Sequence, residues 1–118
     1  MDNQEAFNKM MEGLASQDWE RSMGTIRGEH QCAYRGDGGK RCAFGWLIPD
    51  ERYQESFEGE IANTVRHSIP ELTSVSAVLL NNAQVIHYCS LSSPEEKRQK
   101  YRQLAKLLRL DIPDVLKE

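Results

Sequence analysis

Thiols and imidazoles are the side chains of this sequence that could bind a metal. Cys32 and Cys42 flank the glycine-rich stretch CAYRGDGGKRC, and zinc takes nitrogen and sulfur ligands at about 2.0 to 2.3 Å. Structural zinc sites usually pair ligands about two to four residues apart, but nine residues separate these two cysteines. The remaining candidate ligands are His30, His67, His87 and Cys89. Only one residue separates His30 from Cys32, and only one separates His87 from Cys89, which is too short for this spacing. We therefore favour buried packing for both thiols, and predict no metal and no cofactor.

Catalytic chemistry has weaker support still. A cysteine nucleophile needs a histidine within hydrogen-bond reach and a lowered thiol pKa, whereas burial raises a thiol pKa. No motif here fixes a histidine beside a cysteine. The carboxylates of DERYQESFEGE, residues 50–60, lie on a polar segment that contains a glycine, which is typical of a solvated acidic face. The sequence therefore predicts no catalytic residues.

Positive charge is concentrated near the C-terminal end. On a helical wheel, cations form a stripe beside an apolar one, with no acid between Lys97 and Leu110. This stripe, about 12 Å long from 98 to 106, could meet phosphates, an acidic protein surface, or solvent and the acidic run 50–60. A weaker second site pairs two arginines across a predicted hairpin, where they repel unless an anion or carboxylate lies between them. The predicted partner-binding residues are Arg98, Arg102, Lys106, Arg109, Arg35 and Arg41.

A β-hairpin over about residues 32–48 is predicted to carry the two cysteines. Asp37, Gly38 and Gly39 are strong turn residues between two short apolar runs. A two-residue turn would split the apolar residues over both faces, whereas a three-residue loop collects them on one. We prefer the second register, which groups Cys32, Tyr34, Cys42 and Phe44 and sets Arg35 opposite Arg41. We also predict that Gln84 and His87, one helical turn apart, hold the hairpin backbone through buried hydrogen bonds.

Helical periodicity accounts for most of the remaining chain. Ser93, Pro94 and Glu96 give the clearest helix start, a capping box with proline at the first helical position. The elements expected besides the hairpin are a helix over 3–16, a loop over 21–31, a short helix from 50 to 59, a helical turn over 61–67, a largely apolar helix over about 73–89 and a last helix from 93 to about 110. We expect a mainly helical α+β fold, a single globular domain over 1–118.

Composition narrows the class of protein. The chain has 118 residues, which is long enough to fold as one domain. Its net charge of −3 is too small to indicate a particular kind of partner. The first residues are acidic and amidic where a signal peptide would be basic, and no window is apolar enough to span a membrane. Three cysteines, an odd number, are typical of reduced intracellular thiols. We therefore expect a cytoplasmic protein.

Several motifs together resemble a family of small phage, prophage and bacterial proteins. They are CAYRGDGGKRCAFGWLIPDERY, the following Glu58-Gly59 pair, LLNNAQVIHY and the terminal amphipathic helix. Two positions depart from the family pattern: Arg41 replaces the usual lysine, and Tyr88 replaces an acid that commonly follows the histidine. The matching residues are Cys32, Tyr34, Arg35, Cys42, Ala43, Gly45, Leu47, Ile48, Pro49, Asp50, Gln84 and His87. The family has no established activity, so the resemblance implies a phage or mobile-element origin.

These observations lead us to expect a non-catalytic interaction protein. It would be a phage or mobile-element accessory factor or inhibitor that binds a host protein in the host cytoplasm, with an anti-defence role as a special case, and that can also form a homodimer. One alternative is a nucleic-acid-binding regulator that uses the basic C-terminal helix, although the sequence has no DNA-reading motif and no aromatic interleaving. A second alternative is a small enzyme or zinc-binding protein that uses the cysteines and histidines.

Overall fold

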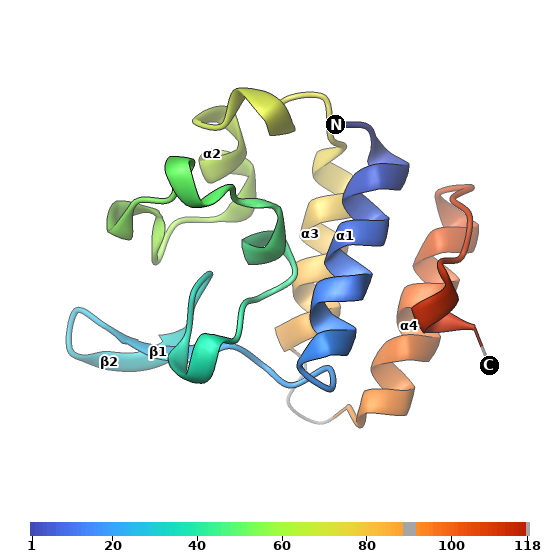
Figure 1. Ribbon diagram of the computed structural model, residues 1–118, viewed down its shortest axis with the longest axis horizontal. Helices are drawn as coiled ribbons and strands as arrows, with labels where there is room; N and C mark the ends of the chain where they lie inside the picture. Colours follow the sequence, from blue (N-terminus) through green and yellow to red (C-terminus); the bar gives the residue numbers. More distant parts are fainter. Residues whose placement is uncertain (89–91, 118) are drawn as a thin grey trace.

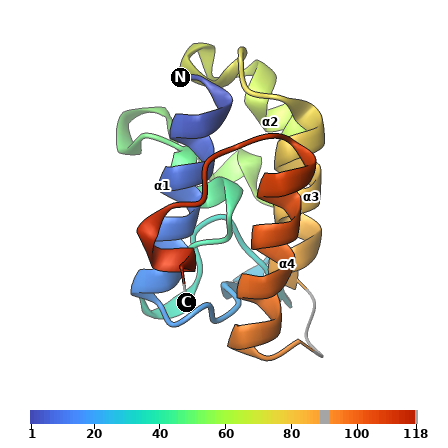
Figure 2. The same ribbon diagram turned by 90° about the vertical axis from the view of Figure 1, so that its right-hand side faces the viewer.

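Three helices lie side by side in the computed structural model, which describes residues 1–88 and 92–117. They are α1 (Asn3–Ser16), α3 (Ala77–Tyr88) and α4 (Pro94–Leu107), with the short α2 (Ala62–His67) near one end (Figures 1 and 2). An antiparallel hairpin of β1 (Met23–Ile26) and β2 (Glu29–Cys32) projects on the side away from α4 (Figure 1). The predicted mainly helical α+β fold is confirmed.

Helix α1 spans the predicted residues. The Asp2 carboxylate accepts a hydrogen bond from the Glu5 backbone N–H at 2.8 Å, which satisfies one of the free donors at the helix start. Its apolar residues recur at helical spacing and are buried against the rest of the core. The helix ends where Asp18 and Trp19 adopt left-handed backbone angles, with φ of 54° and 62°. This turn redirects the chain toward the hairpin.

The position of the hairpin differs from the prediction. Strand pairing joins residues 23–26 to residues 29–32, a segment we expected to be a loop. Arg27 and Gly28 connect the strands with φ of 51° and 84°, as a two-residue type I′ turn requires. A left-handed backbone angle is slightly unfavourable for Arg27. The type I′ turn forms nevertheless, because its twist matches that of the strands and because Gly28 adopts the second left-handed angle without strain. The prediction of a hairpin over 32–48 is therefore wrong in location.

The stretch 32–48 turns back on itself with only one bridge. Arg35 pairs with Arg41 around the Asp37–Gly39 turn, which is the residue pair that the preferred register set opposite each other. Beyond it, residues 44–47 form a 3₁₀ turn. The backbone N–H groups that would pair with a second strand donate to side chains instead. The Phe44 N–H donates to the Gln84 side-chain oxygen, and the Gly45 N–H donates to the Cys42 sulfur. The backbone of Gly45 also packs directly against that of Tyr34. A Cβ atom at position 45 would lie only 2.2 Å from the Tyr34 carbonyl oxygen, so only glycine fits there.

Helices α3 and α4 pack together through a buried tyrosine. The Tyr101 hydroxyl donates to the Ala83 carbonyl at 2.8 Å, and the Tyr101 side chain is fully buried. The predicted capping box at Ser93 and Glu96 is present. Both helices are shorter than predicted: α3 starts at Ala77, α4 ends at Leu107, and the expected end of α3 at Cys89 lies outside the described residues. Among the helices of 1–88 and 92–117, none has the length and apolar character needed to cross a membrane.

The acidic segment after Pro49 contains two separate 3₁₀ turns where we expected one short helix. These turns span Asp50–Arg52 and Glu55–Phe57. Extended backbone at Tyr53 and Gln54 separates them. Gly59 closes the segment with φ of 88°, a left-handed angle suited to glycine. The break lets Tyr53 and Phe57 turn their rings toward each other, with centroids 6.4 Å apart.

Candidate interaction surfaces

Cys42 has a structural position in the core. Its side chain is fully buried, and its sulfur accepts hydrogen bonds from the Gly45 N–H at 3.2 Å and from the Gln84 amide at 3.5 Å. Burial raises the pKa of the Cys42 thiol to about 12, so the thiolate that a nucleophile or metal ligand needs is disfavoured. Tyr34 and Phe44 pack nearby, with their ring centroids 5.6 Å apart. These contacts hold the 42–45 turn in place.

Cys32 is separate from this cluster. It lies half-buried in β2, where its thiol donates to the Met23 sulfur at 3.7 Å, and burial raises its pKa. In the parts of the chain that the structure describes, no three side chains of histidine, cysteine, aspartate or glutamate lie close enough to hold a metal ion. Cys89, one of the candidate ligands, falls outside those parts.

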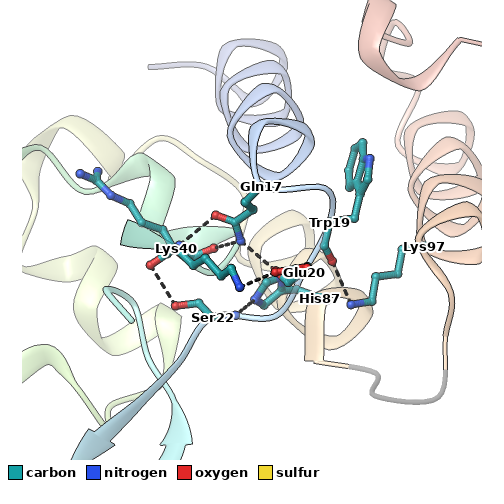
Figure 3. A network of polar contacts seen from close by, with 8 residues as sticks. Gln17, Trp19, Glu20, Ser22, Lys40, His87 and Lys97 are labelled. Carbon is teal, nitrogen blue, oxygen red and sulfur yellow. Dashed lines mark hydrogen bonds and ion pairs between the residues drawn. The ribbon is translucent and has the colours of Figure 1, made fainter. Parts of the chain in front are cut away.

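Gln84 and His87 anchor the segments in front of α3. The Gln84 side-chain oxygen accepts from the Phe44 N–H at 2.9 Å, and its amide donates to the Tyr88 hydroxyl at 2.9 Å. His87 Nε2 accepts from the Ser22 N–H at 3.3 Å, just before β1. Figure 3 shows His87 beside Ser22. The two residues thus hold two different segments, whereas the prediction gave both of them to one hairpin.

Further polar contacts in the same region link α1 and α4 (Figure 3). The Gln17 side chain at the end of α1 exchanges hydrogen bonds with the Arg41 backbone at 2.7 and 3.0 Å. The Ser22 hydroxyl donates to the Lys40 carbonyl at 3.1 Å. From α4, the buried Lys97 ammonium donates to the Trp19 carbonyl at 3.1 Å. This network joins segments from both ends of the chain and serves the fold.

Replacing Gln84 with methionine tests the anchoring of residues 42–45. The change keeps the side-chain length but leaves the buried Phe44 N–H without an acceptor, so we expect the free energy of unfolding to fall by about 1–3 kcal/mol. Chemical denaturation measures it. The same substitution at Gln99, which is exposed on α4, should change stability by less than about 0.5 kcal/mol. Equal effects at both positions would contradict the anchoring role.

Glu58 is a buried carboxylate that sequence reasoning missed. Only 6% of the residue is exposed. One oxygen accepts from the Tyr34 N–H at 2.8 Å, and the other accepts from the Arg35 N–H at 3.2 Å and from the Tyr53 hydroxyl at 2.7 Å. Within the acidic run, predicted to be a solvated face, Glu58 instead fastens residues 53–58 to residues 34–35. The Glu58-Gly59 pair was the only sequence signal for it.

Arg35 and Arg41 share a carboxylate. Asp50 Oδ1 lies 2.7 Å from Arg35 Nη2 and 3.5 Å from Arg41 Nη2. The two guanidinium groups also lie over aromatic rings, Arg35 4.3 Å from the Tyr53 centroid and Arg41 5.0 Å from the Trp46 centroid. Their charges are therefore engaged within the molecule, where they hold the turn around Asp50. This leaves them poorly suited to a partner-binding role.

The structure divides the four cations predicted on the last helix into two pairs. Arg98 and Arg102 both form ion pairs with Glu95, one turn or two before them, and Arg102 also donates to the Leu116 carbonyl at 2.8 Å. These hydrogen bonds, led by that of Arg98, lower the pKa of Glu95. Glu95, the acid that pairs with this half of the stripe, lies just before the acid-free stretch from Lys97 to Leu110. The remaining pair is Lys106 and Arg109.

Arg109, predicted on the last helix, lies two residues beyond the end of α4 with φ of 58°. We call Lys106, Leu107 and Arg109 together the basic end of α4. All three are exposed, and neither cation forms an ion pair with any described residue. Leu107 is 75% exposed, the highest value among the described large apolar side chains. An exposed leucine that lies close in the sequence to two cations without described ion pairs makes this segment a candidate interaction surface. No protein-family model, curated protein or solved structure matches this chain.

Proposed function

We propose that the protein is a non-catalytic interaction protein that binds an acidic surface of a host protein through the basic end of α4. The observation that carries this proposal is Leu107, which is 75% exposed and lies between two exposed cations, Lys106 and Arg109, in the sequence. Burying a leucine side chain contributes about 1.5–3 kcal/mol, while Lys106 and Arg109 speed the encounter and select an acidic partner. Together they supply both affinity and specificity.

The environments of Cys42 and His87 support a role without catalysis. Burial raises the pKa of Cys42 to about 12 and lowers that of His87 to about 3, which leaves neither group in the ionised form for chemistry near neutral pH. The resemblance of the sequence to phage and prophage proteins supports a mobile-element origin. The protein would then act in the host cytoplasm as an accessory factor or inhibitor, for example against a host defence complex.

A nucleic-acid-binding regulator is the second candidate, because Lys106 and Arg109 could also contact phosphates. Leu107 argues against it, since an apolar side chain between two phosphate-binding cations contributes nothing to such contacts. The two candidates differ in salt dependence. Binding carried by phosphates weakens steeply as the salt concentration rises, whereas binding that buries Leu107 weakens less.

Capture from a bacterial lysate with matched variants tests the proposal. We expect the wild-type chain to enrich a specific protein, and Leu107→Asp or the double variant K106E/R109E to reduce that enrichment at least about tenfold, a loss of about 1.4 kcal/mol. Quantitative mass spectrometry measures the enrichment. Val115→Asp, a change at an exposed apolar residue outside the basic end of α4, is the control and should retain the partner.

Two outcomes would contradict the proposal. One is a capture profile that is the same for the wild-type chain and Leu107→Asp. The other is binding to mixed DNA or RNA that falls with salt, is lost in K106E/R109E and is unchanged in Leu107→Asp, as fluorescence anisotropy would measure; this would instead favour the nucleic-acid-binding regulator.

A further inference from the structure

Helix α3 leaves an uncovered face on the surface. Its inner side is buried in the core, while four residues at positions i, i+3, i+4 and i+7 are exposed on the other side. We call these the outer face of α3: Val78, Asn81, Asn82 and Val85. The two valines are 55% and 69% exposed. Figure 2 shows α3 along one edge of the molecule, with α1 toward the opposite edge.

The outer face of α3 carries no formal charge. Between Ala77 and Tyr88 the sequence has no lysine, arginine, aspartate or glutamate, and its only histidine is buried on the inner side. A surface helix normally places charged residues on its solvated face, whereas a helix apolar on both sides is normally covered. The outer face of α3 therefore has the composition of a contact surface. Ile61, which is 68% exposed and lines the same cleft as Asn81 and Val85, extends it.

The sequence of this face is symmetric about its centre. It reads Val-x-x-Asn-Asn-x-x-Val over residues 78–85. When two such helices cross antiparallel about a two-fold axis between Asn81 and Asn82, Val78 meets Val85 of the partner subunit. Asn81 likewise meets Asn82 of the partner subunit, and two amides can exchange hydrogen bonds. A two-fold interface needs a surface that complements itself, and this face meets that requirement.

We propose that the outer face of α3 binds a second copy of this chain as an antiparallel helix pair. Its electrostatics favour that occupant, because an uncharged face brings two copies together without repulsion, whereas the basic end of α4 would repel its own copy. The valines span about 10 Å along the helix, so the contact lies at the small end of specific interfaces and the dimer is concentration-dependent. This inference uses a surface separate from the basic end of α4 and does not depend on the proposed function.

Sedimentation equilibrium of the full chain tests the dimer. We expect the weight-average mass to rise from that of one chain toward that of two as the concentration increases, and Val85→Glu to abolish the rise by placing a carboxylate in the contact. Val115→Glu, the same change at an exposed valine outside α3, should leave it intact. Because Val85 is exposed, its substitution should not prevent folding; circular dichroism checks this. A single-chain mass up to about 1 mM, or a dimer unaffected by Val85→Glu, would overturn the proposal.

Charge exchange tests the antiparallel register. Val78→Lys and Val85→Glu should each weaken the dimer, whereas V78K/V85E should restore it, because each lysine then meets a glutamate of the other copy. A parallel pair would instead set lysine against lysine and show no rescue. As a second measurement, a mixture of V78C and V85C chains should form a mixed disulfide under mild oxidation. Absence of rescue together with preferential V78C–V78C disulfides would overturn the antiparallel pairing.

Discussion

Replacing Glu58 with alanine is expected to lower the free energy of unfolding by about 3–5 kcal/mol, because three donors lose one shared acceptor. The buried Tyr34 N–H then costs about 1–3 kcal/mol, and each of the two part-buried donors costs about 1 kcal/mol. Two of the donors are the backbone N–H groups of Tyr34 and Arg35, which cannot move to another partner without moving the chain. The third is the Tyr53 hydroxyl. Against a typical stability of about 5–15 kcal/mol, this loss would be visible as a large fall in melting temperature.

Three further variants separate the contributions at Glu58. Glu58→Gln keeps one oxygen acceptor and should be less damaging than alanine, while Tyr53→Phe removes only the hydroxyl and should cost least. Glu55→Ala, at an exposed position in the same segment, should change stability by less than about 0.5 kcal/mol. Urea denaturation of the four proteins gives the ranking. If Glu58→Ala were no more damaging than Glu55→Ala, Glu58 would not be the link between residues 34–35 and 53–58.

Acid is expected to destabilise the protein through His87. Burial first, and then the nearby positive charges of Lys97 and Arg21, lower the pKa of His87 from 6.5 to about 3. The unfolded chain therefore takes up a proton near pH 6.5 while the folded chain does not, and protonation favours unfolding. The full stability is present above pH 6.5 and falls as the pH decreases toward about 3. The slope is about 1.4 kcal/mol per pH unit, so the total loss reaches about 3–5 kcal/mol.

The pH dependence of His87 can be isolated by substitution. Glutamine places an oxygen near the position of Nε2, so His87→Gln can still accept from the Ser22 N–H without titrating. We expect this variant to lose most of the slope between pH 6 and 4 that the wild-type protein shows. His67→Gln, at an exposed histidine of α2, controls for substitution alone and should keep the wild-type slope. Parallel curves for all three proteins would show that His87 does not control the acid sensitivity.

The helices were predictable because their signals are local. Apolar residues at helical spacing predicted α1, and Ser93, Pro94 and Glu96 predicted the start of α4. The hairpin was misplaced because Asp37, Gly38 and Gly39 give a stronger turn signal than Arg27 and Gly28, which form the actual turn. Tertiary contacts decided the outcome: Gln84 and Cys42 accept the N–H groups of residues 44 and 45, which leaves no ladder for a second strand.

The charged surfaces were harder to predict, because the sequence shows charges without their partners. The sequence predicts the cation stripe near the C-terminus, but Glu95 lies before the stretch that defines it and forms ion pairs with two of its members. The need for a carboxylate between Arg35 and Arg41 was foreseen, and Asp50 supplies it from nine residues beyond Arg41. Glu58 resembled its exposed neighbours because only the folded chain brings Tyr34 and Arg35 to it.

The hydrogen bonds of α3 to Ser22 and Phe44 couple two distant amide groups. Each of these buried N–H groups donates to a side chain of α3, so neither is protected by a regular backbone ladder. Solvent reaches them only when α3 moves away from the segments in front of it, and a single displacement of this helix exposes both. Exchange with solvent at positions 22 and 44 is thus linked to the same opening of the molecule, although 21 residues lie between them.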